Sequence, residues 1–511
     1  MRSRSPLLAA AVTAALLAGC SSSSDSSSGS SSDTGAEGVA ETVRYAAPGS
    51  PTVATDDPHG LLPGESDIVR MALTYDPLTV PGPDGEAQPR LATSWTPDEK
   101  LTTWTIELRD DAVFSDGEPV RAADALFSLR RMEEKAAENF ARLRMFDLKK
   151  SSAVDENTLE LVTTEPYAEV GIALAGATFV VPEGSTDFTG ETPVAGSGPF
   201  VPAGGDAQTA LFDRNDDWWG PQPPSQHIEV RAIPDPQARA DALLAGEVDW
   251  AGAVPATAAQ TLDKETAALA EIPGSTMYPL TMRTDTKPFD DPLVREAVRL
   301  ALDRQQLLDT VFLGYGDLGN DLITPADVSS PDLPQREQDL AKAKELMAQA
   351  GLADGVDITL YSTTAYAGMD TAATLISEQL AEIGIRAKVE LSPPDSYFVD
   401  VYGQKPFYLS YLGGIGFLDV VRVALTPGSP SNETAWEDKK WSADLATALA
   451  EPDEATRREQ LGELQTRLRD EGGYAVWAVS DRLDLTAPGL SGLPQGIGFA
   501  TAFVDQVKLA N

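Results

Sequence analysis

The stretch Ile228–Trp250, IEVRAIPDPQARADALLAGEVDW, carries the signals of two strands and of the helix between them. Apolar and polar residues alternate over 228–233, which is the period of a half-buried strand. Residues 236–246 begin with a proline and end with a glycine, as helices commonly do. A second short strand is expected over 247–250. Two strands joined by a helix form a βαβ unit, so we expect an α/β fold.

The same alternation of strands and helices extends through the rest of the chain. Single cores stop growing near roughly 250–300 residues, so a chain of 511 residues predicts two or more lobes. We therefore expect a mixed-sheet α/β protein in two halves. The expected strands are 42–46, 104–108, 158–162, 357–361, 386–391, 407–412 and 474–479, and the expected helices are 122–135, one from Asp291 onward, 340–350, 369–383 and 454–470.

The first 19 residues have the pattern of a secretory signal peptide. Arg2 and Arg4 precede an apolar run, Leu7–Ala18, that is too short to span a bilayer as a helix. Elsewhere no apolar run approaches about 18 residues, so no transmembrane helix is expected. Residues 20–40 are mostly serine and other small or polar residues, which predicts a flexible tether before a folded part that starts near Glu41.

Cys20 is the only cysteine in the sequence and follows directly after the predicted signal peptide. A buried free thiol is one alternative, but no amphipathic element surrounds Cys20, and a disulfide would need a partner from another chain. The residues Leu17-Ala18-Gly19-Cys20 resemble the bacterial lipobox, whose cysteine receives a diacylglycerol and becomes the mature N-terminus. The resemblance implies a lipid anchor at Cys20, and two acyl chains suffice for stable membrane attachment.

Composition argues against several classes of function. The formal net charge is −40, so the surface repels phosphate backbones and nucleic-acid binding is not expected. The two histidines, His59 and His227, are far apart and have no cysteine nearby, which argues against a His–Cys metal site. The glycine-rich residues 195–200 lack the sequence context of a phosphate-binding loop, and no Gly-x-Ser-x-Gly motif occurs. We expect no catalysis and no cofactor.

Aromatic residues near predicted strand ends are the more informative candidates. They are Trp218, Trp219, Tyr278, Tyr408 and Tyr411. Ordinary core packing is one explanation for each of them. The other is ligand contact, because strand ends that face a crevice are where α/β proteins hold ligands.

Several stretches together resemble one family, the extracytoplasmic solute-binding proteins of ABC importers, peptide/nickel-binding type (family 5). They follow the family's order, and the resemblance extends from about residue 42 to residue 511. The stretches are DPH (57–59), PRLATSW (89–95), FSDGEPVRAAD (114–124), GSGPF (196–200) with RN (214–215) and WWG (218–220), LLAGEVD (243–249) and PFDDPLVREA (288–297).

The resemblance implies a periplasmic-binding-protein-like clamp of the class II type, with two hinged lobes and an extra subdomain on lobe I. Carried onto this chain, lobe I comprises 41–70, 190–280 and 485–511, the subdomain 71–189, and lobe II 281–484. A solute binds between the lobes, and a membrane permease is the implied partner. We expect a monomer that is held at the cell membrane by the lipid on Cys20.

The resemblance also implies which residues lie in the cleft. The residues after the DPH turn are Leu62, Pro63 and Gly64, and Tyr278 precedes the PFDD stretch. Dipeptide binders of the family carry W-x-G-D after a lobe II strand, with an aspartate that pairs with the amino terminus of the peptide. This chain has Tyr411-Leu412-Gly413-Gly414 there, so Gly414 removes the carboxylate, and Asp419 lies five residues further on.

Three alternatives to peptide capture remain open from the sequence. Within the family, the solute is a metal chelate held by aromatic and arginine side chains. From another class, the protein is a surface carbohydrate hydrolase that uses two facing carboxyl groups about 5–9.5 Å apart. A third alternative is a sensor or chaperone-like surface protein with the same clamp and without a permease.

Overall fold

The computed structural model describes residues 38–52, 54–60, 62, 64–82, 85–135, 143–176, 178–189, 193–364, 368–414, 416–425, 429 and 431–510. Contacts divide the chain into two units, 1–38 and 39–511, and the description below concerns the second. The predicted signal peptide, Cys20 and most of the tether lie outside the described residues. Within the described ranges, no helix is long and apolar enough to cross a membrane.

Strand β1 (Thr42–Ala47) lies at the centre of the half that we call lobe I. It pairs in parallel with β10 (His227–Ala232) on one side and with β11 (Trp250–Ala251) on the other. Helix α4 (Pro236–Leu244) connects β10 to β11. The predicted strand–helix–strand unit is therefore confirmed, with β1 inserted between its two strands, but the strand expected over 247–250 begins only at Trp250.

Residues 246–249 precede strand β11 and are held by Arg44, whose backbone carbonyl accepts from the Asp249 N–H at 2.8 Å. Its guanidinium donates to the Asp249 carboxylate at 2.7 and 3.0 Å and to the carbonyls of Gly246 and Glu247 at 3.1 and 3.0 Å. The Arg44 backbone N–H also donates to Asp249, at 2.8 Å. The alternating pattern of the sequence could not reveal this contact, since the two partners lie 205 residues apart.

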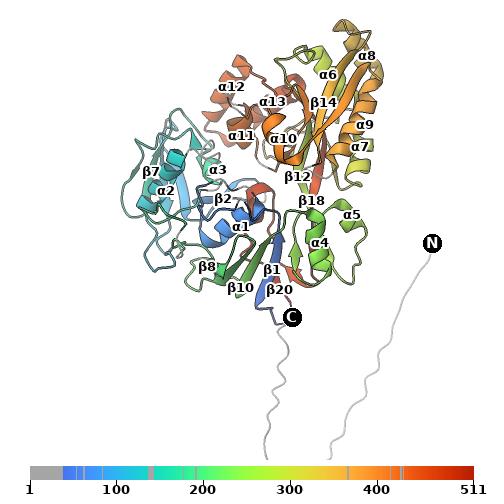
Figure 1. Ribbon diagram of the computed structural model, residues 1–511. Helices are drawn as coiled ribbons and strands as arrows, with labels where there is room; N and C mark the ends of the chain where they lie inside the picture. Colours follow the sequence, from blue (N-terminus) through green and yellow to red (C-terminus); the bar gives the residue numbers. More distant parts are fainter. Residues whose placement is uncertain are drawn as a thin grey trace, which may run out of the picture. The chain divides into compact units, whose positions relative to one another are not determined.

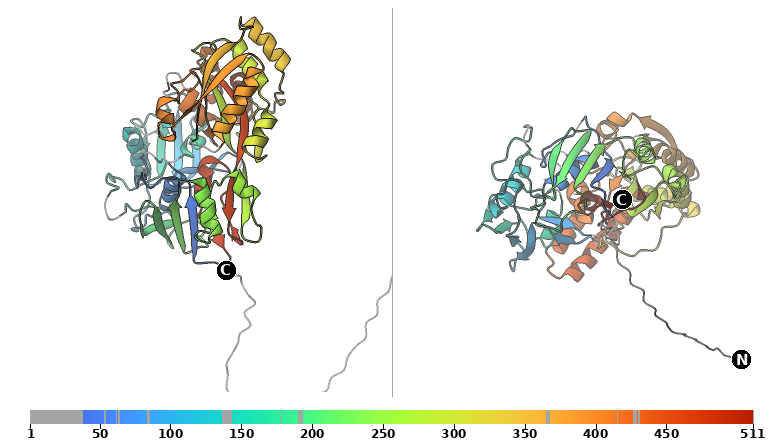
Figure 2. Two further views of the ribbon diagram at one scale, coloured as in Figure 1. Left: turned by 45° about the vertical axis from the view of Figure 1, so that its right-hand side comes forward. Right: turned by 90° about the horizontal axis from the view of Figure 1, so that it is seen from below.

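The remaining elements of lobe I extend and cover this sheet. Beyond β10 it continues with antiparallel β9 and β8, and α1 packs against β8 and β10. Val39 forms a bridge with Ala510, so the two ends of the described body meet (Figures 1 and 2). These elements are α1 (Glu65–Thr74), β8 (Phe200–Gly205), β9 (Thr209–Arg214), α5 (Ala256–Gln260), β19 (Leu490–Ser491), the 3-10 helix η3 (Gly498–Ala502) and β20 (Lys508–Leu509).

Two long antiparallel strands, β12 (Ala268–Met282) and β18 (Tyr474–Thr486), run through both lobes and join them (Figure 1). In lobe I, β18 pairs with β11, and in lobe II, β12 pairs with β16. The pairing of β12 with β18 is interrupted between Ile272 and Thr276, where the register shifts. A register shift of this kind bends a strand locally, and here it lies where the chain passes from one lobe to the other.

Lobe II is built on the parallel strands β14 and β15, with β16 beside β14. The sequence predicted α8, α9, β14 and β15 to within two residues, but the strand expected over 407–412 is divided into β16 and β17. The elements are α6 (Pro292–Ala301), α7 (Arg304–Val311), β13 (Gly316–Leu318), α8 (Leu340–Gln349), β14 (Val356–Thr363), α9 (Met369–Ala381), β15 (Ile385–Ser392), α10 (Pro394–Asp400), β16 (Phe407–Leu409) and β17 (Leu412–Gly413).

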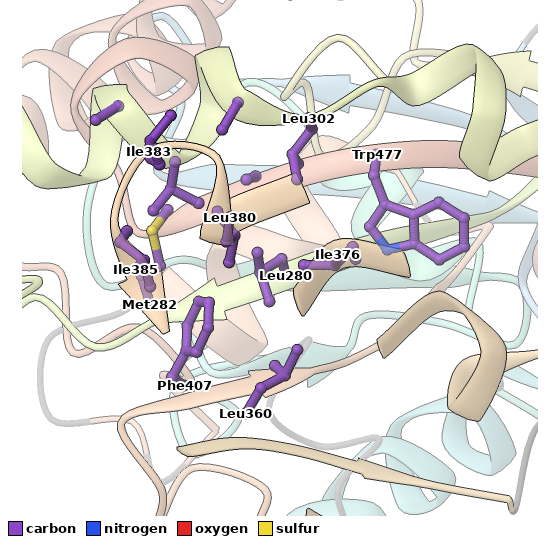
Figure 3. Packing of buried hydrophobic residues seen from close by; sticks show 14 of the residues in the cluster. Leu280, Met282, Leu302, Leu360, Ile376, Leu380, Ile383, Ile385, Phe407 and Trp477 are labelled. Carbon is purple, nitrogen blue, oxygen red and sulfur yellow. The ribbon is translucent and has the colours of Figure 1, made fainter. Parts of the chain in front are cut away.

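The core of lobe II lies between this sheet and its helices. Leu280 and Met282 of β12, Leu360 of β14, Ile376 of α9 and Phe407 of β16 are buried in one cluster (Figure 3). Burial of each such side chain contributes about 1.5–3 kcal/mol. Because β12 supplies part of this core, the strand that enters lobe II is held there by packing as well as by pairing.

A second group of helices packs on the opposite face of β18, because Val476 and Val479 belong to this group whereas Ala475 and Trp477 belong to the first core. Trp441, Leu464 and Val476 are buried together in this group. Asp438 and Asp453 cap two of the helices, because their carboxylates accept from the backbone N–H groups of Trp441 at 2.6 Å and Thr456 at 2.9 Å. The group consists of α11 (Phe417–Val420), the short π-helix η2 (Val421–Leu425), α12 (Lys439–Leu449) and α13 (Glu454–Glu471).

The subdomain has a sheet and a core of its own. Its antiparallel strand order is β4-β5-β7-β6, and α2 packs on it through Leu126 and Leu129, as the helical spacing over 122–135 predicted. The elements are β2 (Thr79–Pro81), β3 (Ala87–Pro89), β4 (Ala92–Pro97), β5 (Thr103–Leu108), α2 (Ala122–Lys135), β6 (Ser152–Ala153), β7 (Thr158–Val162) and α3 (Val170–Leu174).

The DPH turn attaches lobe I to helix α2 of the subdomain. Arg131 on α2 donates to both carboxylate oxygens of Asp57, at 2.7 and 2.8 Å, and to His59 Nδ1 at 3.0 Å. Since Nδ1 accepts, Nε2 carries the proton and donates to the Phe179 carbonyl at 2.8 Å. Burial lowers the pKa of His59 to about 4, so the ring is neutral at pH 7.

Acid is expected to destabilise the protein through His59. The pKa of His59 is about 4 in the folded state and 6.5 when unperturbed, so the unfolded state binds more protons between those values. The stabilising contribution is complete above pH 6.5 and falls by about 3 kcal/mol as the pH drops to 4. Urea unfolding at several pH values measures it. The His59→Gln variant, which cannot be protonated there, is expected to show a smaller slope, and an equal slope would contradict the assignment.

Candidate functional site

A cavity of about 1180 Å³ lies where β12 and β18 pass between the lobes. Lobe I contributes the start of α1, the start of α4 and the loop 493–502, and the subdomain contributes the β2–β3 turn and α3. Lobe II contributes the end of α7 with the following loop and residues from the 411–419 segment. Segments that are far apart in the sequence form the wall of this cavity. Its shape therefore depends on the position of the two lobes relative to each other.

Arg482 on β18 is the centre of a charged cluster on the lobe I side of the cavity. It donates to the Glu65 carboxylate at 2.9 Å and to Asp484 at 2.8 Å. Burial opposes the charge of Arg482, but Asp484 and Glu65 outweigh it and raise the pKa of the guanidinium. Asp484 also accepts from Trp250 Nε1 at 2.9 Å, and the Trp250 ring stacks on Tyr45 with centroids 3.7 Å apart. The cluster therefore holds two carboxylates on one guanidinium, and Arg482 is engaged within the protein.

Arg239, the other arginine lining the cavity, is also occupied by the protein. It donates to the carbonyls of Gly252 at 2.6 Å, Ile233 at 2.7 Å, Pro234 at 3.0 Å and Ala253 at 2.7 Å. Burial lowers the pKa of Arg239, and the four carbonyls provide the dipoles that a buried cation needs. Both arginines among the described lining residues thus have fixed partners.

Glu271 on β12 and Asp481 on β18 form a pair of carboxyl groups in the cavity wall. Burial, a hydrogen bond to Glu271 and the nearby charge of Asp317 raise the pKa of Asp481 to about 6, although the Gly274 N–H donates to Asp481 at 3.1 Å. Like charges this close disfavour the fully ionised state. Positively charged groups are therefore attracted to this wall and anionic groups are repelled.

Aromatic side chains form the lobe II side of the cavity. Tyr278 and Phe312 line it, with ring centroids 4.7 Å apart, and both pack on the buried Trp477 at 5.6 Å. Burial raises the pKa of Tyr278 to about 12, so its hydroxyl stays protonated. Such a wall offers apolar contact and π faces to a solute.

Most of the residues predicted for the cleft meet in this cavity. The predicted residues that line it are Leu62, Gly64, Tyr278, Tyr411, Gly414 and Asp419. Gly413, in β17, does not line it, and Pro63 lies outside the described residues. Whether these residues contact a solute stays a prediction.

The other aromatic candidates have structural roles. Tyr408 is fully buried. Trp218 and Trp219 donate through Nε1 to Asp76, at 3.1 and 2.8 Å, and Arg90 donates to the same carboxylate at 2.7 Å. Core packing was one of the two explanations offered by the sequence, and it holds for these three aromatic residues.

Asp419 and Gly414 differ from what a peptide-amine site requires. The Asp419 carboxylate accepts from Arg422 at 2.9 Å, so a fixed cation already neutralises it. A Cβ on Gly414 would lie 2.8 Å from the Ser275 carbonyl and 2.9 Å from Ile497. The Ser275 carbonyl and Ile497 therefore occupy the space in which a side chain at position 414 would begin.

Sequence reasoning missed the charged residues of the cavity. Glu65 directly follows the predicted Gly64, and the alternation of Ser480–Thr486 continues the strand predicted over 474–479. Extension of that strand would have placed Asp481, Arg482 and Asp484 on it. No local signal shows that Arg482 pairs with Glu65, because they are 417 residues apart.

The family model of the bacterial extracellular solute-binding proteins, family 5, matches residues 86–433. The chain belongs to this family. The glutathione-binding protein GsiB of Salmonella typhi is 27% identical over 397 residues, which is 72% of this chain and 76% of that protein. GsiB of Escherichia coli is 26% identical over 416 residues, or 77% of this chain and 79% of that protein. The predicted family is thus confirmed, and its members are extracellular binding proteins of bacteria.

Solved structures of family 5 proteins share the fold. The binding protein DppA from Helicobacter pylori, in complex with the peptide STSA, superimposes with a TM-score of 0.78 at 22% identity, covering 93% of this chain and 99% of that one. NikZ from Campylobacter jejuni, in complex with Ni(L-His), has a TM-score of 0.78 at 18% identity, covering 91% and 99%. The expected class II clamp with two lobes is confirmed.

A side chain at position 414 is expected to destabilise this family 5 protein, whereas one at 413 is not. Gly414→Ala must displace the Ser275 backbone or Ile497, and such overpacking costs about 1–3 kcal/mol. An added Cβ at Gly413 meets nothing within 4 Å, so Gly413→Ala is expected to change stability by less than about 0.5 kcal/mol. Urea unfolding compares the two variants. Equal midpoints would show that the residues around position 414 move and accommodate the added methyl group.

Proposed function

We propose that this family 5 protein is the lipid-anchored solute-binding component of an ABC importer. It captures a peptide or peptide-sized solute between its lobes and delivers it, as a monomer without a cofactor, to a membrane permease. The observation that carries the proposal is the cavity lined from both lobes. A solute that contacts both lobes favours their closed arrangement, and that shift in population prepares the protein for docking.

The size of the cavity supports a peptide-sized solute. Pockets for small ligands have volumes of about 300–1,000 Å³, and this one has about 1180 Å³. Related proteins bind glutathione, the peptide STSA or Ni(L-His), so the fold alone selects none of these classes. The division into lobe I (41–70, 190–280 and 485–511), subdomain (71–189) and lobe II (281–484) belongs to the same proposal, although β12 and β18 cross its boundaries and carry Tyr278 to the lobe II side and Arg482 to the lobe I side.

The charges of the cavity support a solute that is neutral or positively charged. The two lining arginines have partners within the protein, so neither is available to a ligand carboxylate without breaking those bonds. Glu271 and Asp481 add negative charge to the wall. A peptide with a basic side chain fits this field better than one with an acidic side chain.

Capture of a metal chelate is the second candidate within the family, and the aromatic wall of Tyr278 and Phe312 is the feature that supports it. The carbohydrate hydrolase has less support. No contact identified among the described residues places a pair of facing carboxyl groups about 5–9.5 Å apart in the cavity. A sensor without a permease shares the clamp. Gene deletion separates the two functions, because it abolishes solute uptake only if the protein is part of an importer.

Thermal melting with matched peptides tests the proposed solute class. Ala-Lys-Ala is expected to raise the melting temperature more than Ala-Ala-Ala, and Ala-Glu-Ala less. A ligand at 100 times its Kd stabilises the folded state by about 2.7 kcal/mol. The variant Glu271→Gln/Asp481→Asn is expected to lose the preference for the lysine peptide. If no peptide raises the melting temperature and Ni(L-His) does, the chelate replaces the peptide as the proposed solute.

Tyr411→Ala serves as the site variant in the same assay. We expect a smaller ligand-induced shift at an unchanged melting temperature of the free protein, because Tyr411 lines the cavity and is only half-buried. Leu244→Ala is the control, since Leu244 is 55% exposed and lies away from the cavity. An equal ligand-induced shift in melting temperature in the two variants would show that Tyr411 does not contribute to solute binding.

We also propose that Cys20 attaches the protein to the cell membrane through a thioether-linked diacylglycerol. The lipobox-like residues 17–20 and the serine-rich tether support this. Metabolic labelling with an alkyne fatty acid is expected to mark the wild-type chain and a Ser24→Ala control, and not a Cys20→Ser variant. Label on Cys20→Ser, or an unlabelled wild-type chain, would contradict the anchor.

A further inference from the structure

Polar contacts outside the cavity join the subdomain to lobe II. They connect the β2–β3 turn and the loop before α3 with η2, α12 and α13; Figure 1 shows the positions of α3, α12 and α13. We call these contacts the interlobe latch. Its residues are Glu86, Tyr167, Ala168 and Glu169 on the subdomain and Arg422, Leu449, Arg457 and Arg458 on lobe II.

The centre of the latch is a largely buried ion pair beside a backbone hydrogen bond. Arg457 at the start of α13 donates to Glu169, which precedes α3, and both side chains are more than four-fifths buried. The Ala168 N–H donates to the carbonyl of Leu449, the last residue of α12, at 2.7 Å. Opening of the lobes breaks both contacts and exposes Glu169 and Arg457 to water.

The second contact of the latch starts in the cavity wall. Asp419 accepts from Arg422 at 2.9 Å, and the same guanidinium donates to the Tyr167 hydroxyl at 2.6 Å. Burial opposes the charge of Arg422, but its interactions with Tyr167 and with the Asp419 carboxylate outweigh burial and raise its pKa, so it stays charged. A residue that lines the cavity is thereby linked, through one side chain, to the opposite side of the cleft.

The third contact is exposed. Arg458 pairs with Glu86 in the β2–β3 turn and also with Glu454 one helical turn before it. Exposed pairs contribute little to stability and are screened by salt. We expect this contact to respond to ionic strength more strongly than the pair at the centre of the latch.

We propose that the interlobe latch is a closure determinant, with Arg422 and Glu169 as positioning residues that set solute affinity without touching the solute. The apparent affinity of a binding protein falls in proportion to the fraction of molecules in the competent state. Contacts that exist only in the closed arrangement raise that fraction. The proposal goes beyond capture of a particular solute, since it concerns the closure of the lobes whichever solute binds.

The subdomain side of the latch is the better place for a test. Arg457 also donates to the carbonyls of Glu451 and Pro452 within lobe II, so its removal would disturb that lobe. Tyr167→Phe removes only the hydroxyl that accepts from Arg422 and keeps the buried ring. Glu169→Gln removes the charge at nearly constant volume. The double variant Tyr167→Phe/Glu169→Gln therefore weakens the latch and leaves both arginines in place.

Distances between spin labels on the two sides of the cleft measure closure. Val154 in the subdomain and Val399 in lobe II are 60% and 74% exposed, and Cys20→Ser removes the only native cysteine from the full chain. In Val154→Cys/Val399→Cys protein without added solute, we expect the latch variant to shift the distribution toward longer distances. The ratio of open to closed molecules is expected to rise about 10-fold. The affinity for Ala-Lys-Ala is expected to fall by the same factor as the closed fraction.

Arg386→Gln is the matched control, because it breaks an exposed pair with Asp357 that lies within lobe II. It is expected to leave the distances unchanged. An unchanged distribution in a latch variant that melts like the wild type would overturn the proposal. Should that variant melt at a lower temperature, the single variant Tyr167→Phe decides, because it keeps the ring and every charged group in place: longer distances are expected, and no change would overturn the latch. Since these distances need no solute, the outcome is independent of the peptide assay.

Discussion

The pairing of β12 with β18 is the constraint on which the rest of the structure depends. Each strand contributes to the sheet of lobe I at one end and to that of lobe II at the other. The register shift between Ile272 and Thr276 interrupts this ladder beside the cavity. Strand pairing keeps the lobes connected, and the interruption gives a place where backbone angles can change with few hydrogen bonds lost.

The sequence predicted those elements whose signal is local. Helix 122–135 has apolar residues at helical spacing and matches α2, and Ile358 and Leu360 lie on a strand as expected. Strand β12 was missed because Pro273, Gly274 and Pro279 interrupt its pattern, although its partner β18 stabilises it along most of its length. Family resemblance located six residues of the cavity wall. The pairing of its charges could not be predicted, since their partners meet only in the folded chain.

The charged residues of the cavity are mostly engaged with one another. Arg482 pairs with Glu65 and Asp484, Arg239 is surrounded by carbonyls, and Asp419 is held by Arg422. Such an arrangement costs little reorganisation when a solute enters, because the donors are already fixed. The two proposals assign it separate tasks: Glu271 and Asp481 would select the charge of the solute, whereas Asp419, through Arg422, would hold the subdomain.

Lobe II enters and leaves the rest of the chain at adjacent points. Thr281 at the end of β12 is paired with Tyr474 at the start of β18, and the intervening residues return to the strand beside which they departed. In topological terms lobe II is an insertion into a single hairpin-like pair. A segment with such closely spaced ends can be exchanged as a cassette, since the junction requires no new connection and no change in strand order. Recombination at these two positions would therefore combine the two joining strands and the lobe I side of one cavity with Phe312 and the 411–419 segment of another.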